Sequence, residues 1–217
     1  HINSLEQACY DKKDSLASCQ DILLVGSTKI HGSNGAISIH PQTKEYKFQK
    51  RTSFISREHD NQGMVALLEP NIVDMVQRII DVFPNAIENI CVYGEICGKG
   101  VQKIVGVSEL RRFFCIFHIN VDGKPVPIEN WKNLRFPEYR VFNVQDYGLF
   151  IIEHANLVAD LDNVKRQVME ATLKIEEECP VALGIGSIKG IGEGIVWIGY
   201  HPDGRKAIKF KSKGKIK

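Results

Sequence analysis

The segment Asp21-Ile-Leu-Leu-Val-Gly-Ser-Thr-Lys29-Ile-His-Gly-Ser-Asn34 decides how this chain of 217 residues is interpreted. After Asp21, an apolar run typical of a buried strand leads directly to Lys29. Gly32 permits a tight turn, and there the backbone can approach a ligand closely. A lysine between a buried strand and such a turn can be held rigidly in a pocket. The segment alone is also compatible with a surface lysine beside a turn. Motifs elsewhere in the chain are needed to distinguish the two interpretations.

The flanking sequence contains both strand-like and helix-like patterns. Residues 35–51 alternate in the manner of a hairpin, with a turn around Pro41. Residues 70–83 carry apolar side chains at helical spacing, with Pro70 near the first turn and Pro84 at the end. Further strands are predicted over residues 89–96 and 113–121, a second helix over 160–178 ended by Cys179-Pro180, and a last hairpin over 195–198 and 207–210. These elements predict an α+β fold with antiparallel sheets flanked by helices, in one compact domain over residues 1–217.

The overall charge is nearly balanced, but the C-terminal segment is strongly basic. The formal net charge is +2, and hydrophobic residues at 43% and charged residues at 25% are ordinary globular values that argue against large-scale disorder. From Arg205 to Lys217 the chain contains no acid. Such a segment attracts a polyanion such as RNA, DNA or a triphosphate, or it serves only solubility.

Cysteine usage and hydropathy indicate a reduced intracellular protein. The six cysteines form no CxxC pair and no Cys/His zinc spacing, and Cys91 and Cys115 lie within apolar runs where a thiol behaves as a small hydrophobe. No apolar stretch is long enough to span a bilayer, and the first residues show no signal-peptide pattern. We therefore expect no membrane association.

Five short motifs occur in a fixed order along most of the chain. They are Lys29-Ile-His-Gly32, Tyr93-Gly94-Glu95 continuing to Gly98-Lys-Gly100-Val-Gln102, Phe113-Phe-Cys-Ile-Phe117, Glu193-Gly194-Ile195-Val196 and Lys209-Phe210-Lys211. Together, over residues 25 to 213, they resemble the motifs of the covalent nucleotidyltransferase superfamily of polynucleotide ligases and capping enzymes. The resemblance is strongest to the RNA ligase 2 group typified by phage T4. Two positions depart from that group, with His118 where Asp is usual and Thr28 where Glu is usual.

The resemblance implies the adenylation (nucleotidyltransferase) domain of an ATP-dependent RNA ligase, of the ATP-grasp-like ligase type. Lys29 would attack the α-phosphate of ATP to form lysyl-AMP, with Mg²⁺ or Mn²⁺ as the metal. AMP would pass to an RNA 5′-phosphate, and a 3′-OH would then seal the phosphodiester. The expected partner is RNA with such ends, for example a nicked duplex, and the expected state is a monomer. No accessory OB or C-terminal domain is expected within these 217 residues.

The candidate site residues follow from the motifs. Lys209 and Lys211 would lie on one strand face as a phosphate clamp, although lysines of a solvated edge strand show the same pattern. Glu95 and Glu193 would serve the metal and the nucleotide, or be ordinary turn acids. The predicted catalytic residues are Lys29, His31, Lys209 and Lys211, the predicted nucleotide-binding residues are Thr28, Lys29, Ile30, Asn34, Arg51, Glu95, Phe117, Glu193, Lys209 and Lys211, and the predicted metal ligands are Glu193 and Glu95.

Several roles and alternatives accompany this prediction. Phe117 would stack on adenine or simply be part of the core, and the Arg51 guanidinium suits phosphate. His31 would orient RNA ends or the AMP phosphate rather than supply charge, or merely pack in the turn. Lys213, Lys215 and Lys217 are expected to serve RNA affinity. A DNA ligase or an mRNA capping guanylyltransferase shares the motif layout, and a non-catalytic RNA-binding module is the alternative of a different class.

Overall fold

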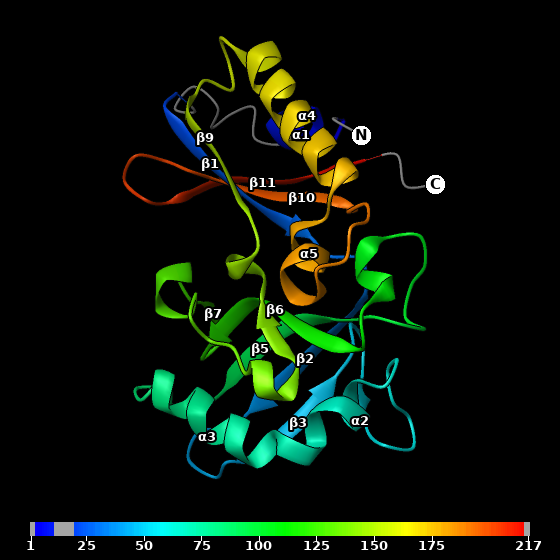
Figure 1. The fold of residues 1–217 in the computed structure, drawn as a ribbon. Coiled ribbons are helices and arrows are strands. Elements are labelled where there is room, and N and C mark those ends of the chain that lie inside the picture. The colour runs from blue at the N-terminus through cyan, green and yellow to red at the C-terminus, as the bar shows by residue number, and fades with distance from the viewer. Residues whose placement is uncertain (1–2, 11–19, 215–217) are drawn as a thin grey trace. The chain divides into compact units, whose positions relative to one another are not determined.

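The computed structural model describes residues 3–10 and 20–214. Cys19, Lys215 and Lys217, which entered the sequence analysis, lie outside the described residues. The chain divides into two compact units, and Figure 1 shows its helices and strands. The first unit comprises residues 1–30, 104–107 and 147–217, and the second comprises residues 31–103 and 108–146.

The first unit is built on a four-stranded antiparallel sheet in the order β11-β10-β1-β9. Its strands are β1 (Ile22–Lys29), β9 (Leu149–Ala155), β10 (Gly194–Tyr200) and β11 (Lys206–Lys213), and its helices are α1 (Asn3–Tyr10), α4 (Leu161–Glu177) and α5 (Pro180–Gly186). Apolar side chains of α4, such as Val168, are buried together with Leu24 and Trp197 of the sheet. A side chain at Gly26 would come within 2.9 Å of the Trp197 ring, so this position in β1 requires glycine.

The second unit is built on a seven-stranded sheet in which β4-β3-β2-β5-β6-β7 are neighbours and β8 pairs with β6. Its strands are β2 (Ser33–Ile39), β3 (Tyr46–Gln49), β4 (Phe54–Ile55), β5 (Ile90–Cys97), β6 (Phe113–Val121), β7 (Lys124–Pro125) and β8 (Val141–Asn143), and its helices are α2 (Met64–Leu68) and α3 (Ile72–Val82). The helices bury Met64, Met75 and Ile79 against Ile37 and Val92 of the sheet. Short 3₁₀ helices lie at Glu69–Asn71, Gly106–Glu109, Ile128–Asn130, Pro137–Tyr139 and Val144–Asp146.

This mixed architecture confirms the predicted combination of antiparallel sheets and helices. One strand pair, β6 with β8, is parallel. The expectation of a single domain stays a prediction, because two compact units that exchange chain segments are compatible with one domain or with two. The described cysteines are buried, and burial raises the pKa of the Cys91 and Cys179 thiols, which keeps them protonated. Within the described residues, no helix has both the length and the apolar character needed to cross a membrane.

One detail of the helix predictions was wrong, and one helix was not predicted. Val73 is one of the apolar residues of the segment 70–83 that was predicted as an amphipathic helix, yet it is 77% exposed because it lies outside the face that packs on the sheet. The predicted end of the second helix at Cys179-Pro180 is confirmed, since α4 ends at Glu177. The sequence did not predict α5, whose first turn contains Pro180 because its fixed φ and missing N–H are tolerated there.

Candidate active site

Lys29 is the last residue of β1 and lies beside β10, which in turn pairs with β11. In the sheet register, Lys29 is opposite Gly194 of β10, and Gly194 is opposite Lys213 of β11. Gly194 has a φ of +151°, and a side chain there would come within 2.1 Å of the Ser212 carbonyl oxygen. Only glycine therefore allows β10 to begin against β11 at this point, directly after Glu193.

The carboxylate of Glu193 bridges Lys29 and Lys213. Its Oε2 accepts a hydrogen bond from Lys29 Nζ at 2.5 Å, and its Oε1 lies 3.0 Å from Lys213 Nζ. The side chains of Glu193, Lys29 and Lys213 are 7%, 17% and 47% exposed. We refer to these three residues as the ion cluster. It holds one carboxylate and two ammonium groups, and it opens to solvent on the Lys213 side.

The ion cluster makes the charge of Glu193 depend on folding. Burial alone would raise the pKa of Glu193, but hydrogen bonds from Lys29 and Lys213 outweigh burial and lower that pKa. A lowered pKa means that the carboxylate is more stable in the folded chain than in the unfolded chain. Its contribution to the free energy of unfolding is present above the ordinary pKa of 4.5 and is lost as the pH falls through the folded pKa.

We expect Glu193→Gln to lower the free energy of unfolding at neutral pH by about 1.5–3 kcal/mol, because two ammonium groups lose their charged acceptor. The difference from wild type should shrink in acid, since the wild-type carboxylate is then protonated as well. Urea unfolding of both proteins from neutral pH down to strongly acidic pH measures this. A difference that stays constant over that range would show that the lysines do not stabilise the Glu193 charge.

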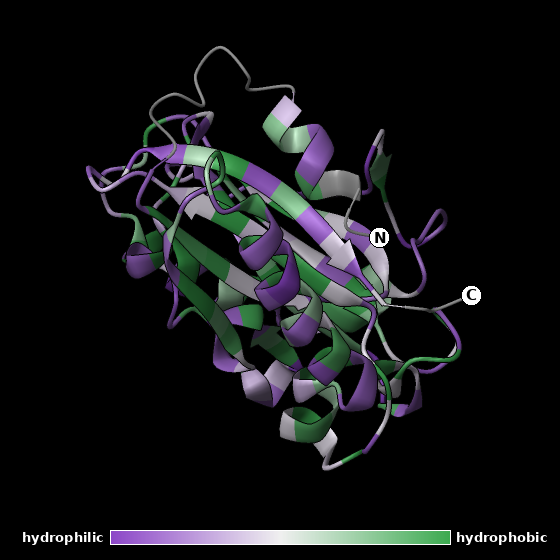
Figure 2. Cartoon of the chain, turned by 90° about the horizontal axis from the view of Figure 1, so that it is seen from above, coloured by the Kyte–Doolittle hydropathy of each residue, from purple (hydrophilic) through white to green (hydrophobic). Residues whose placement is uncertain are grey.

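Lysines alternate with buried residues along β11, and Figure 2 shows the alternation of hydrophilic and hydrophobic residues in the strand that leads to the C-terminus. Lys209, Lys211 and Lys213 are exposed, and the residues between them are buried. The predicted placement of Lys209 and Lys211 on one strand face is therefore confirmed. Partial desolvation, together with the charges of Lys206 and Lys211, lowers the pKa of Lys209. The basic groups along this strand thus repel one another.

Lys213 is a residue of this site that the sequence prediction assigned elsewhere. It was grouped with Lys215 and Lys217 as a contributor to RNA affinity, yet its ammonium group contacts Glu193. A sequence signal existed, because Lys213 continues the period of two that selects the other lysines of the strand. The pairing of Lys213 with the start of β10, however, depends on the hairpin register.

Thr28 and Ile30, which were predicted to bind nucleotide, are 3% and 7% exposed. The Thr28 Oγ1 donates a hydrogen bond to the Tyr147 carbonyl oxygen at 3.0 Å. The Thr28 hydroxyl is therefore used inside the first unit. Any contact of Thr28 or Ile30 with a nucleotide would rely on backbone groups, and their binding role stays a prediction.

Asn34 and Glu95 lie side by side in the sheet of the second unit. Asn34 of β2 is opposite Glu95 of β5 in the register, and both residues are partly exposed. Because Ile37 and Ile39 of β2 belong to the hydrophobic core, the alternation of side chains directs Asn34 to the other face. This face therefore carries two of the predicted nucleotide-binding residues together.

Phe117 occupies a β-bulge on the strand next to β5. Tyr93 is opposite His118 whereas Gly94 is opposite Ile116, so Phe117 is the additional residue of β6. Phe117 and His118 are both partly exposed, and the rings of Tyr93 and His118 lie 5.7 Å apart. Bulges redirect side chains, and this one presents aromatic rings at the sheet surface.

Two residues that the sequence analysis did not select hold the turn after Lys29. Asn61 accepts a hydrogen bond from the Ser33 hydroxyl at 3.1 Å and donates one to the Asn34 carbonyl oxygen at 3.0 Å. Gln102 donates to the Gly32 carbonyl oxygen at 3.4 Å. Asn61 gave no sequence signal, because its partners are distant in the chain. Gln102 belonged to a motif, but its contact was not predictable.

The predicted site residues are divided between the two units. His31 follows β1 and is partly exposed, and Arg51 is exposed in the turn between β3 and β4. The first unit contains Thr28, Lys29, Ile30, Glu193, Lys209 and Lys211, and the second contains His31, Asn34, Arg51, Glu95 and Phe117. The chain passes from one set to the other between Ile30 and His31.

Glu193 and Glu95 are the predicted ligands of a divalent metal. Among the described residues, no three or more His, Cys, Asp or Glu side chains are grouped as metal ligands. Magnesium, however, is commonly held by one or two carboxylates together with water and substrate phosphates. Glu193 can supply such a carboxylate, because its lowered pKa keeps it charged at neutral pH. Glu95 is a second, partly exposed carboxylate in the other unit.

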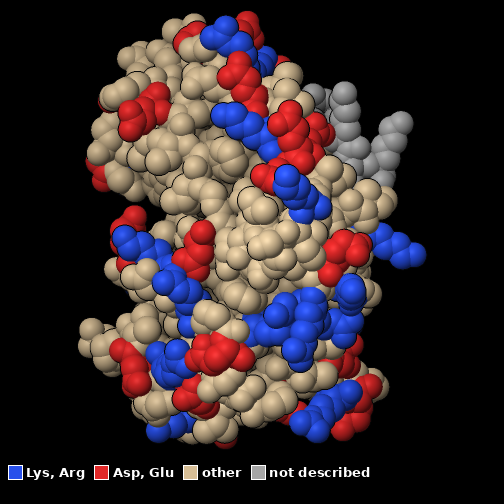
Figure 3. Space-filling model, in the orientation of Figure 1, with Lys and Arg blue, Asp and Glu red and all other residues tan. Residues whose placement is uncertain are grey.

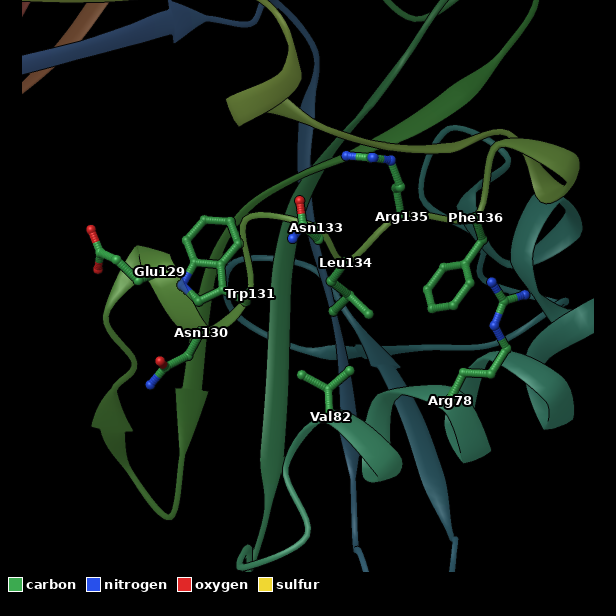
Figure 4. Close-up of a pocket in the computed structure, with 9 residues that line it drawn as sticks. All are labelled: Arg78, Val82, Glu129, Asn130, Trp131, Asn133, Leu134, Arg135 and Phe136. Carbon is green, nitrogen blue, oxygen red and sulfur yellow. The ribbon is translucent and has the colours of Figure 1, made fainter.

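A cavity of about 240 Å³ lies in the second unit and contains none of the predicted site residues. It is lined by Arg78, Val82, Glu129, Asn130, Trp131, Asn133, Leu134, Arg135 and Phe136 (Figure 4). The Arg78 guanidinium lies 4.5 Å from the centre of the Phe136 ring and pairs with Glu138 at 2.6 Å. Arg135 pairs with Asp146 at 2.5 Å. The two arginines thus stabilise the fold by contacts with their own unit.

Known structures with this fold include RNA ligases from Naegleria gruberi. A lysine-to-alanine mutant with ATP and Mn has 15% identity and a TM-score of 0.61, over 97% of this chain and 54% of that one. A lysine-to-methionine mutant with AMP and Mn has 15% identity and a TM-score of 0.60, over 97% and 54%. The enzyme with pyrophosphate has 17% identity and a TM-score of 0.56, over 93% and 52%. The present chain thus spans about half the length of these ligases.

The structural likeness concerns the fold, because the identities are low. No curated protein sequence matches the chain significantly. A family model described as RNA ligase matches residues 23–211, which is most of the chain and includes both Lys29 and Glu193. The chain therefore belongs to the RNA ligase family.

Proposed function

We propose that this chain is the adenylation part of an ATP-dependent RNA ligase, with Lys29 as the nucleophile. The observation that carries the proposal is the ion cluster, in which a largely buried lysine at a strand end contacts a buried carboxylate. Membership of the RNA ligase family supports this assignment. The similar Naegleria structures contain ATP, AMP or pyrophosphate, and Mn in two cases, which supports ATP and a divalent cation as ligands here.

The proposed reaction begins at the Lys29 amine. Its Nζ attacks the α-phosphorus of ATP, an N–P bond forms, and the bond from that phosphorus to the bridging oxygen breaks and releases pyrophosphate. The amine must give up its proton first, because only the neutral form is nucleophilic. AMP then passes to an RNA 5′-phosphate and frees Lys29. A 3′-OH displaces AMP, loses its proton and forms the phosphodiester.

Glu193 controls when Lys29 can react. A Lys29 amine that donates its hydrogen bond to this carboxylate is directed at Glu193 and not at a phosphorus atom. Attack therefore requires Lys29 to leave Glu193, and Lys213 keeps Glu193 in place when that happens. A divalent cation held by Glu193, with Glu95 as a second candidate ligand, would supply charge neutralisation at the phosphates.

The remaining predicted residues would bind the nucleotide and the RNA. We propose that Lys211 and Lys213 contact phosphate groups, because they share the strand face that carries the ion cluster. In the second unit, Phe117 would stack on adenine and Glu95 would contact the ribose. Arg51 would contact phosphate, and Asn34 would shape the pocket. The proposed substrate is RNA with 3′-OH and 5′-phosphate ends, such as a nicked duplex, bound by a monomer.

Incubation with radiolabelled ATP and a divalent cation, followed by a denaturing gel and peptide mapping, tests this function. We expect a covalent AMP adduct on Lys29 and sealing of nicked RNA. Labelling with GTP instead would identify a capping guanylyltransferase, and preferential sealing of nicked DNA would identify a DNA ligase. RNA binding without any covalent adduct would favour a non-catalytic RNA-binding module.

His31→Ala should slow sealing of a pre-adenylated RNA nick by about 10²-fold, as loss of correct positioning of the reacting groups can do, and leave Lys29 adenylation nearly unchanged. His31 follows the nucleophile by two residues, but a neutral imidazole supplies no fixed negative charge to hold an ammonium group or a metal. Single-turnover rates of each step, measured separately, make the comparison. Equal losses at every step would indicate a collapsed pocket and contradict the role in sealing.

A further inference from the structure

Hydrogen bonds to backbone carbonyl oxygens hold four basic residues of the second unit together. The Lys99 N–H donates to the Leu110 carbonyl oxygen at 2.9 Å, and the Lys99 carbonyl oxygen accepts from Arg112 Nη2 at 3.1 Å. The Arg140 guanidinium donates to the carbonyl oxygens of Arg111 at 2.7 Å and Arg112 at 2.8 Å. We refer to Lys99, Arg111, Arg112 and Arg140 as the basic corner.

The basic corner is not neutralised by acids. Within residues 3–10 and 20–214, no ion pair joins any of its four residues to a carboxylate. Glu138, two residues before Arg140, is paired with Arg78 at 2.6 Å. Glu109 is the one acid between residues 98 and 112, and its side chain is exposed to solvent.

Burial and a neighbouring positive charge both disfavour the charged form of a basic group in the corner. Desolvation, and then the charge of Arg111, lower the pKa of Arg140. The Arg112 Nε is buried without a hydrogen-bond partner among the described residues. Such an arrangement is unfavourable in the protein by itself, because like charges are held close together without counter-charges. An anionic ligand would relieve the repulsion.

Glycine residues fix the geometry of the corner. Gly98 has a φ of +108°, and a side chain there would come within 2.7 Å of the Arg112 Cα. Gly63 has a φ of +77°, and a side chain there would come within 2.4 Å of the Arg112 Nη1. Two glycines in the left-handed region thus let the backbone pack closely around Arg112. The backbone that carries Lys99 and Arg111 is therefore held in place before any ligand binds.

Lys99 and Arg111 are the side chains of the corner that a ligand can reach. Both are exposed, whereas Arg112 and Arg140 are partly buried and use their guanidinium groups to bind the backbone. Figure 3 shows that Lys and Arg side chains gather densely in parts of the face drawn. The corner differs from a random surface group because its own hydrogen bonds bring three separate chain segments together, at Lys99, at Arg111 and Arg112, and at Arg140.

We propose that the basic corner binds the phosphate backbone of the RNA substrate, an inference that rests on the proposed ligase function. A guanidinium and an ammonium group on adjacent, fixed segments suit consecutive phosphates of a polyanion. Neutralised phosphates release counterions, so binding through the corner depends steeply on salt. An acidic protein surface is the competing ligand, and the test below separates the two.

The test compares two double variants in binding to a nicked RNA duplex with a 5′-phosphate. Lys99→Ala with Arg111→Ala removes both exposed charges and keeps the backbone groups that hold the corner. Affinity should fall about 10²-fold at 0.1 M salt, at about tenfold per contact, and the slope of log K against log salt should become shallower by about 2. The matched control, Lys132→Ala with Lys174→Ala, removes two exposed lysines of other segments and should change neither quantity.

The outcomes separate this inference from the proposed function. Lys29 labelling by ATP alone should be unchanged in the corner variant, because neither residue belongs to the proposed catalytic set. An unchanged RNA affinity and salt slope would overturn the inference and leave an acidic protein as the ligand to seek. Altered RNA binding in a protein that never forms an AMP adduct would support the corner and refute the ligase. If the alanine double variant has a lower Tm than wild type, the double variant Lys99→Gln with Arg111→Gln replaces it. Its RNA affinity and salt slope are then compared with those of wild type.

Discussion

Lys29→Ala is expected to abolish covalent labelling by ATP while the protein stays folded. The proposed adduct is a bond between Lys29 Nζ and phosphorus, and alanine has no atom that can form it. The fold should survive, because Glu193 retains its contact with Lys213 and the rest of the core is untouched. Gel autoradiography after incubation with labelled ATP measures the adduct, and thermal unfolding measures the fold.

Lys29→Arg separates the nucleophile from its charge. A guanidinium can keep the ion pair with Glu193, but it stays protonated and does not attack phosphorus. We therefore expect an unlabelled protein with a Tm close to that of wild type. Labelling at the wild-type level in either variant would place the nucleophile elsewhere and refute the central proposal.

The regular elements of the fold were predictable because their sequence periods are clear. The strand predicted over residues 113–121 has those bounds in β6, and the helix predicted over 160–178 is α4, Leu161–Glu177. The terminal hairpin predicted over residues 195–198 and 207–210 was correctly located, although its strands are longer than predicted. In each case, one local pattern of apolar spacing determines the element.

Elements that depend on tertiary context were missed. No strand was predicted over residues 149–155, where β9 forms the edge of the sheet and leaves Leu149 and Ile151 49% and 58% exposed. Such an edge strand needs its neighbour β1 to be recognised, and its apolar residues do not alternate with polar ones. The parallel pairing of β8 with β6 depends on contacts between distant segments, which no local pattern encodes.

The candidate site likewise contains residues that local sequence motifs predict and a residue that only the tertiary structure reveals. Motif order selected Lys29 and Glu193, and the structure brings their side chains into contact. The second partner of Glu193 was not selected, because only the register of the β10–β11 hairpin reveals which lysine lies opposite Gly194. A shift of two residues would have placed Lys211 there and preserved every sequence pattern.

That register leads to a prediction on which the motif and the geometry disagree. The motif selects Lys209 and Lys211, whereas the ion cluster contains Lys213. Along a strand that rises about 3.4 Å per residue, Lys211 lies about 7 Å and Lys209 about 14 Å from the Lys213 position. Because charges are screened over about 10 Å at 0.1 M salt, Lys209 should influence the ion cluster least.

We therefore expect Lys213→Ala to slow Lys29 adenylation by about 10²–10³-fold, the usual effect of removing one preorganised charge from a reacting oxyanion. Lys211→Ala should follow, Lys209→Ala should have a smaller effect, and Lys206→Ala at the far end of β11 is the matched control with almost none. Single-turnover adenylation at saturating ATP gives the order, and the affinity for RNA should change little in Lys213→Ala. If Lys209→Ala is severe while Lys213→Ala is mild, the clamp is the pair selected by the motif, and the contact of Lys213 with Glu193 has no part in the chemistry.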